Sequence, residues 1–158
     1  MIHSNPKATR RGVLAAGAAA TLGSMSALQA DDKAPENSEL EQQNEELIAN
    51  LCKEIAHLDS DRIAPFVGDD IVFQLIDNQP PIEGKAAFLA GGAQFFAPFE
   101  RAEFIINKSY AIGNLVINHR DDHFYPKGGG ERTTFTVTGF FVVKEGKIVE
   151  WRDYAVPS

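Results

Sequence analysis

The chain has 158 residues and a formal net charge of −7, because 22 Asp and Glu outnumber 15 Lys and Arg. Hydrophobic residues make up 44% and charged residues 23%, which is a globular composition, and the length suits one domain with its own core. The acidic charge argues against nucleic acid or an anionic membrane as the main partner, since both would repel the chain. Cys52 is the single cysteine, so the sequence offers no intramolecular disulfide and no multi-cysteine metal site.

Residues 1–30 have the pattern of an export signal. They contain three cationic side chains but no Asp or Glu. Within this segment the cations come first, then the apolar run 12–22, and then more small residues. The adjacent Arg10 and Arg11 favour the bacterial twin-arginine route, so we expect a periplasmic or secreted protein without stable membrane insertion after cleavage. An uncleaved membrane anchor is the alternative, but the apolar run is short and rich in Ala and Gly for a span of about 30 Å.

A folded domain is expected over residues 39–158, after a flexible polar leader at residues 31–38. Ser38 and Glu41 form a Ser-x-x-Glu capping box, which predicts the start of a helix. The apolar residues that follow recur at helical spacing: Leu47, Ile48, Leu51, Ile55 and Leu58. Cys52 lies beside this stripe, so we interpret it as a small core residue rather than a nucleophile.

Two further helices and a strand follow the first helix. A short helix is expected around Arg62–Phe66, kinked or ended near Pro65, and then a strand over Ile71–Leu75. A third helix is predicted to begin at Gly84, after a turn-rich loop, and to continue to about Phe96.

The rest of the chain has the alternation typical of strands, which we predict over residues 103–112, 114–124, 132–143 and 148–154. Three N-terminal helices and a twisted antiparallel sheet make an α+β domain. All 11 phenylalanines lie between Phe66 and Phe141. The helices and sheet therefore either enclose an apolar cavity or form a plain hydrophobic core.

Alternation along the predicted strand 114–124 separates two sets of side chains. One face carries Asn118, Arg120, Asp122 and Phe124, and the other carries His119, Asp121 and His123. In the last strand, Val149, Trp151, Asp153 and Ala155 share a face that the apolar members mark as buried. A buried carboxylate needs a partner, and Arg120 is the natural candidate for Asp153.

Two carboxylates bridged by one guanidinium can divide the roles of acid and base, because burial favours the protonated form of one while the arginine keeps the other ionised. An ordinary buried ion-pair network is the alternative. The set His119, Asp121 and His123 is spread over a strand in steps of about 6.5–7 Å, which is too wide to hold one metal ion, so we expect a solvated face there. No Gly-x-Ser-x-Gly motif is present. The residues favour an acid/base site without a metal ion or cofactor.

The segment from Gly139 to Tyr154, ending in Gly-Lys-Ile-x-x-Trp-Arg-Asp-Tyr, resembles the C-terminal signature of the limonene epoxide hydrolase family. Arg120-x-Asp122 resembles the Arg-x-Asp of that family, and Pro80-Pro81-x-x-Gly84 fits its preceding loop. The resemblance covers about residues 44–155. The family lies within the nuclear-transport-factor-2-like, ketosteroid-isomerase-like and polyketide-cyclase-like superfamily.

The resemblance implies a cone-shaped α+β fold, a homodimer, a deep apolar pocket and one-step epoxide opening. Asp153 would take a proton from water, Asp122 would protonate the epoxide oxygen, and Arg120 would orient both carboxylates. The family's pocket positions correspond here to Phe95, Phe124, Phe135 and Val137. The family also holds the water with a Tyr-x-Asn pair, where this chain has Gln74 and Ile76. Gln74 can still bind a water, but Ile76 cannot.

Three functions are open at this point, each with a small hydrophobic molecule as partner. The first is hydrolysis of a small lipophilic epoxide to a diol. The second is isomerase, dehydratase or cyclase chemistry on an apolar carbonyl compound, which the altered water pair favours because such reactions need no positioned water. The third is a non-catalytic module of the same fold that binds a hydrophobic ligand.

Overall fold

The computed structural model describes residues 37–75 and 79–157. The predicted export signal and the predicted site residue Ile76 lie outside these ranges. The helical elements are α1 (Glu39–Ile55), α2 (Ser60–Ile63), the 3₁₀ turn η1 (Ala64–Phe66) and α3 (Lys85–Phe96). The strands are β1 (Val67–Gln74), β2 (Ile82–Glu83), β3 (Phe99–Ile112), β4 (Leu115–Pro126), β5 (Thr133–Lys144) and β6 (Lys147–Pro157).

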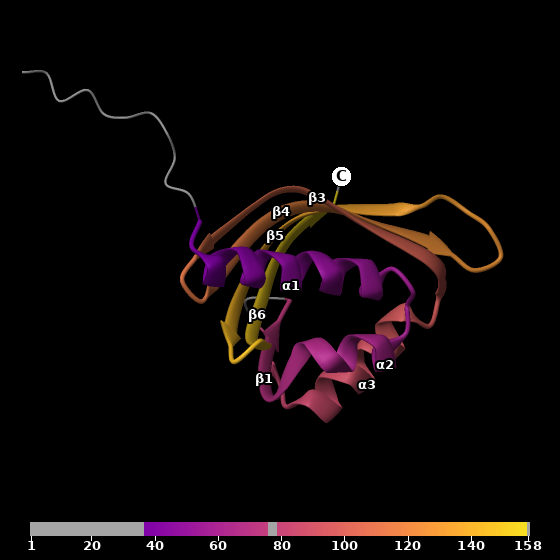
Figure 1. Ribbon diagram of the computed structural model, residues 1–158. Helices are drawn as coiled ribbons and strands as arrows, with labels where there is room; N and C mark the ends of the chain where they lie inside the picture. The colour runs from indigo at the N-terminus through magenta and orange to yellow at the C-terminus, as the bar shows by residue number, and fades with distance from the viewer. Residues whose placement is uncertain (1–36, 76–78, 158) are drawn as a thin grey trace, which may run out of the picture. The chain divides into compact units, whose positions relative to one another are not determined.

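Helix α1 begins at the predicted capping box and lies across the inner face of the sheet (Figure 1). The backbone N–H of Glu41 donates to Ser38 Oγ at 3.3 Å, and the backbone N–H of Ser38 donates to Glu41 Oε2 at 2.7 Å. The apolar stripe packs mainly against β3 and buries four side chains there: Ile48, Leu51, Cys52 and Ile55. Cys52 is a core residue, as predicted, and burial raises the pKa of its thiol to about 12.

The six strands form one sheet in the order β2-β1-β6-β5-β4-β3. Strands β3 to β6 are antiparallel neighbours, as expected, but β1 pairs with β6 in parallel. The sheet is therefore mixed rather than antiparallel, because β6 returns beside a strand that lies far from it in the sequence. The α+β class, with three helices on a curved sheet, is confirmed.

A bulge in β6 changes the predicted pattern of its buried face. Val142 pairs with Glu150, whereas Val143 pairs with Ile148, so Val149 is an extra residue in its strand. Ile148 is buried and Val149 only half-buried, so the prediction of a buried Val149 was wrong. Trp151 lies beyond the bulge and keeps its predicted inward direction, as does Asp153.

The core lies between the inner face of the sheet and the helices, with α1 above β3 and α3 beside β1. No helix in the described part of the chain is long and apolar enough to cross a membrane.

Candidate active site

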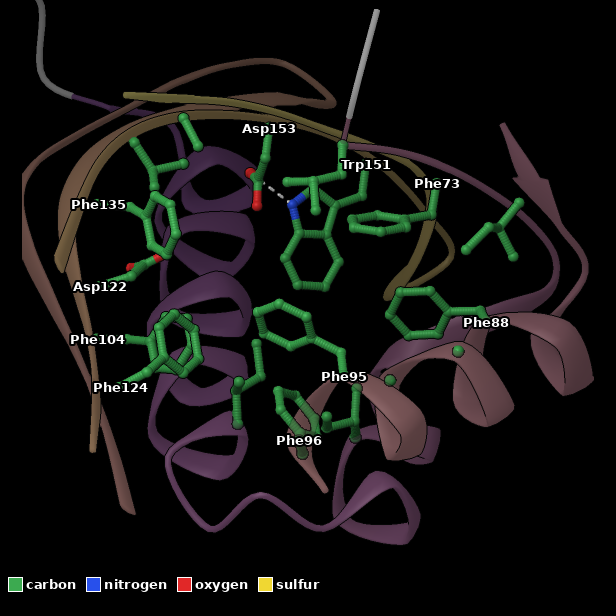
Figure 2. Close-up of a pocket in the computed structure, with 18 of the residues that line it drawn as sticks. Phe73, Phe88, Phe95, Phe96, Phe104, Asp122, Phe124, Phe135, Trp151 and Asp153 are labelled. Carbon is green, nitrogen blue, oxygen red and sulfur yellow. Dashed lines mark hydrogen bonds between the residues drawn. The ribbon is translucent and has the colours of Figure 1, made fainter. Parts of the chain in front are cut away.

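A cavity of about 550 Å³ lies between the sheet and helices α2 and α3. Its wall is mainly apolar, and Figure 2 shows its aromatic members: Phe73, Phe88, Phe95, Phe96, Phe104, Phe124, Phe135 and Trp151. The four predicted pocket residues, Phe95, Phe124, Phe135 and Val137, all border it. Leu75 and Phe95 also expose about two fifths of their surface (42% and 43%), so they mark its mouth.

Three charged side chains meet in the wall of this cavity: Arg120 and Asp122 from β4, and Asp153 from β6. Arg120 Nε donates to both oxygens of Asp122, at 2.9 and 3.1 Å. The two terminal nitrogens of Arg120 donate to Asp153, Nη1 to Oδ1 at 3.2 Å and Nη2 to Oδ2 at 2.6 Å. One guanidinium therefore bridges two carboxylates. Both carboxylates belong to the wall of the cavity, where Figure 2 labels them.

Two neutral side chains complete the arrangement. Trp151 Nε1 donates to Asp153 Oδ1 at 2.7 Å, shown as the dashed line in Figure 2. Asn118 Oδ1 accepts from Arg120 Nη1 at 3.1 Å. The sequence interpretation gave neither residue a role in the site, although alternation had already put Asn118 on the face of Arg120 and Asp122. That signal was sufficient to suggest Asn118, whereas the Trp151 contact depends on side-chain rotamers.

Gly139 provides the space that the arginine occupies. A Cβ at this position would lie 2.5 Å from Arg120 Nη1 and 2.7 Å from Asn118 Oδ1, closer than real Cβ contacts. Gly139 pairs with Asn118 on one side and with Asp153 on the other, so the guanidinium crosses β5 above it. The site therefore requires glycine here for close approach.

The electrostatics distinguish the members of the charged cluster. Burial raises the pKa of Asp122 to about 6, although the Arg120 guanidinium acts in the opposite direction. Burial also acts to lower the pKa of Arg120, but Asp153 and Asp122 outweigh it, so the pKa is raised and the arginine stays charged. A buried carboxyl with a pKa near neutrality can donate a proton, while a carboxylate held by a charged arginine can accept one.

The strand before the loop contributes apolar side chains to the cavity. Phe73 and Leu75 of this region line it, whereas Gln74 does not. Gln74 Oε1 accepts from Arg152 Nη1 at 3.0 Å, and its Nε2 donates to the carbonyl of Gln79 at 3.4 Å. Alternation explains this position, because Gln74 pairs with the exposed Arg152 while Phe73 pairs with the buried Trp151. A role of Gln74 in holding water stays a prediction.

The outer face of β4 is only partly solvated, contrary to the prediction, because His119 is exposed but His123 is buried. The polar residues there have partners of their own. His123 Nδ1 lies 3.0 Å from Thr134 Oγ1, and Asp121 accepts from Asn107 and Thr136. Among the residues that the structure describes, no cluster of three or more His, Cys, Asp or Glu side chains could hold a metal ion.

Comparisons with known proteins identify a family. The model of the SnoaL-like domain matches residues 48–151. No curated protein matches the sequence.

Three solved structures show the same fold. A putative SnoaL-like polyketide cyclase from Jannaschia sp. CCS1 has a TM-score of 0.69 and 20% identity, over 77% of this chain and 91% of its own. An LEH-like epoxide hydrolase from M. tuberculosis has a TM-score of 0.65 and 23% identity, over 73% and 84%. A putative hydroxylase, AclR from Streptomyces galilaeus, has a TM-score of 0.62 and 17% identity, over 73% and 90%. At these identities the likeness shows the fold alone.

Proposed function

The chain belongs to the SnoaL-like domain family, and from this premise we propose that it hydrolyses a small lipophilic epoxide to a diol without a metal ion. The observation that carries the proposal is the bridge from Arg120 to Asp122 and Asp153 in the wall of an apolar cavity. The C-terminal signature supports the same reaction, and the fold is one that the LEH-like epoxide hydrolase from M. tuberculosis also has.

In the proposed step, Asp153 takes a proton from a water molecule as the water oxygen bonds to an epoxide carbon. The carbon–oxygen bond of the ring breaks at the same time, and Asp122 gives its proton to the leaving oxygen. The products are a diol, a protonated Asp153 and an ionised Asp122, and exchange with solvent restores the starting state. The raised pKa of Asp122 suits the role of acid, because a carboxyl of ordinary pKa is almost entirely ionised at neutral pH.

Asp153 keeps capacity for a water molecule despite its partners. It accepts two hydrogen bonds from Arg120 and one from Trp151, while a carboxylate has about four acceptor sites. The remaining site suits the attacking water. Trp151, Ser60 and Gln79 are the uncharged side chains in the described part of the cavity wall that can form hydrogen bonds.

A second candidate is isomerase, dehydratase or cyclase chemistry on an apolar carbonyl compound. The apolar Phe73 and Leu75 favour this chemistry, because they line the cavity in the region where the limonene epoxide hydrolase family holds its water. The same carboxylate pair can move a proton at carbon. Incorporation of solvent deuterium into an apolar ketone, without epoxide hydrolysis, would support this candidate.

The test is a single turnover with enzyme in excess in H₂¹⁸O, using cyclohexene oxide, 1,2-epoxyoctane and limonene oxide. We expect diol carrying one ¹⁸O from the first turnover, because water attacks directly and no covalent intermediate donates an enzyme oxygen. Asp153→Asn should lose about 10²–10⁴-fold in rate. Absence of diol from all three epoxides, or an Asp153→Asn variant of full activity, would reject hydrolysis. Ligand binding without any turnover would favour the non-catalytic module.

We further propose export through the signal at residues 1–30, supported by the adjacent Arg10 and Arg11. Expression of the full chain in a bacterium, followed by N-terminal sequencing of the periplasmic protein, tests this. A mature N-terminus near residue 31 is expected, and an intact N-terminus in the cytoplasm would contradict it.

We also propose that the protein is a homodimer formed through the outer face of the sheet. Large apolar side chains are exposed there, including Ile105, Tyr110, Tyr154 and Val156. Light scattering should give twice the mass of the chain, and Tyr110→Glu should shift the equilibrium toward the monomer. A monomeric mass at micromolar concentration would contradict the proposal.

A further inference from the structure

The charged cluster belongs to a longer row that crosses four strands. Ser109 of β3 pairs with Asn118 of β4, Asn118 pairs with Gly139 of β5, and Gly139 pairs with Asp153 of β6. Side chains of directly paired residues lie on the same face of a sheet. The row therefore lies on the inner face, and Asn118 stands directly behind the guanidinium of Arg120.

The side-chain amide of Asn118 forms a hydrogen bond through its oxygen but not through its nitrogen. The side chain is almost completely buried (1% exposed), and its Oδ1 accepts from Arg120 Nη1. Its Nδ2 has no hydrogen-bond partner among the described residues. If the amide of Asn118 were turned by 180°, its N–H groups would face the N–H groups of the guanidinium. The contact with Arg120 therefore fixes which atom of the amide is the oxygen. A buried, unpaired amide nitrogen is unfavourable for folding, which points to a role for the oxygen.

The position calls for an acceptor that is neutral. Arg120 Nη1 donates to both Asp153 and Asn118. The Asn118 oxygen is the additional acceptor, and it holds the plane of the guanidinium in line with both carboxylates. An apolar residue would leave one N–H of a buried cation unpaired. A carboxylate would add a third negative charge beside one positive charge and would compete with Asp153 for the arginine.

We propose that Asn118 is a positioning residue of the active site: its amide oxygen fixes Arg120 in the bridging orientation, and its neutrality limits the cluster to two carboxylates around one guanidinium. Asn118 does not line the cavity, so it acts through Arg120 and not on the substrate. The kinetic part of this inference rests on the proposed function, whereas the ionisation part does not.

The main experiment is a ¹³C NMR titration of the Asp122 carboxyl in the full chain, assigned by its loss in Asp122→Asn. The titratable groups around Asp122 are Arg120 and Asp121 on the same strand, Asp153 on β6 and the Cys52 thiol on α1. We expect Asn118→Asp to move the midpoint of Asp122 upward by about one pH unit or more, because a like charge disfavours ionisation. Asn114→Asp is the matched control: it adds the same charge at an exposed position in the turn between β3 and β4 and should leave the midpoint in place.

The second experiment replaces the amide with an apolar side chain of similar size, Asn118→Leu. We expect kcat on an epoxide that the wild type hydrolyses to fall about tenfold or more while KM changes little, because the catalytic geometry loosens and the cavity wall is unchanged. Asn118→Asp, which keeps an acceptor for Nη1, should fold even if Asn118→Leu does not.

Two results would overturn the inference. One is an Asp122 midpoint that Asn118→Asp leaves unchanged, or that Asn114→Asp moves equally. The other is a folded Asn118→Leu variant with the kcat of the wild type. If no epoxide is hydrolysed by the wild type, the proposed function fails, but the NMR titration still decides whether Asn118 controls the ionisation of the cluster.

Discussion

The two faces of β4 place neighbouring aspartates in opposite environments. Asp122 is buried on the inner face beside Arg120, and its pKa is raised to about 6. Asp121 points outward, and hydrogen bonds from Asn107 and Thr136 lower its pKa. One step along the chain thus reverses the direction of the shift. A nearby arginine does not by itself keep a carboxyl acidic, since burial outweighs it at Asp122 while two neutral donors are sufficient at Asp121.

The largest expected effect is on catalysis, through substitution of each aspartate in turn. Asp122→Asn removes the proposed acid and should lower kcat/KM for epoxide hydrolysis by about 10²–10⁴-fold. Asp121→Asn changes the same atoms on the opposite face and should retain the wild-type value. Steady-state kinetics of both purified variants measure this, and equal losses would mean that the difference between the faces has no catalytic consequence.

The next effect concerns neighbouring residues on β5. Gly139→Ala inserts a methyl group where Arg120 lies and should lower activity about 10²-fold through displacement of the guanidinium. Thr138→Ala alters the adjacent, outward-facing residue and should have little effect on activity. Thermal unfolding should show a lower Tm for Gly139→Ala only. Normal activity of that variant would contradict the close packing of the inner face.

The pH dependence of activity is the third test. Because Asp122 must be protonated to act as the acid, kcat/KM should fall about tenfold per pH unit above about pH 6. Asp121→Asn should leave this decline in place. A decline that begins only above pH 8, measured over pH 5–9, would show that another group supplies the proton.

The smallest effect is on the free energy of unfolding, whose dependence on pH should have opposite signs for Asp122 and Asp121. Asp122 has a folded pKa above its unfolded value, so the free energy of unfolding should decrease by on the order of 1–3 kcal/mol between about pH 4 and pH 6. Asp122→Asn should abolish this decrease. Asp121 has a lowered pKa, so its contribution exists above about pH 4 and disappears as the pH falls through its folded pKa. Urea unfolding of the wild type and of both Asn variants at pH 3–7 tests both signs.

The inner face of β4 was predictable because the strand pairs with β5 in unbroken register, so its side chains alternate between the two faces of the sheet. Asn118, Arg120, Asp122 and Phe124 are all buried, as alternation requires. The capping box at Ser38 and the α+β class were likewise accessible, since both depend on local patterns.

The rest depends on contacts that local patterns do not contain. The bulge at Val149 breaks the period in β6, and it is visible only once the strand is paired with β5. The parallel pairing of β1 with β6 joins distant segments, and it turns Phe73 toward Trp151 and Gln74 toward Arg152. Resemblance to a family proposed Gln74 as a water-binding residue, but the direction of a side chain depends on the strand that carries it.

Trp151 is the only tryptophan of the chain, and its indole lies in the cavity wall with its N–H on Asp153. Its ring centroid is 5.1 Å from that of Phe73 and 5.2 Å from that of Phe141. The tryptophan fluorescence of the protein therefore originates entirely at the site. A ligand that enters the cavity, or a proton that reaches Asp153, changes the surroundings of the one emitting residue, so occupancy can be followed in the unlabelled protein before any substrate is identified.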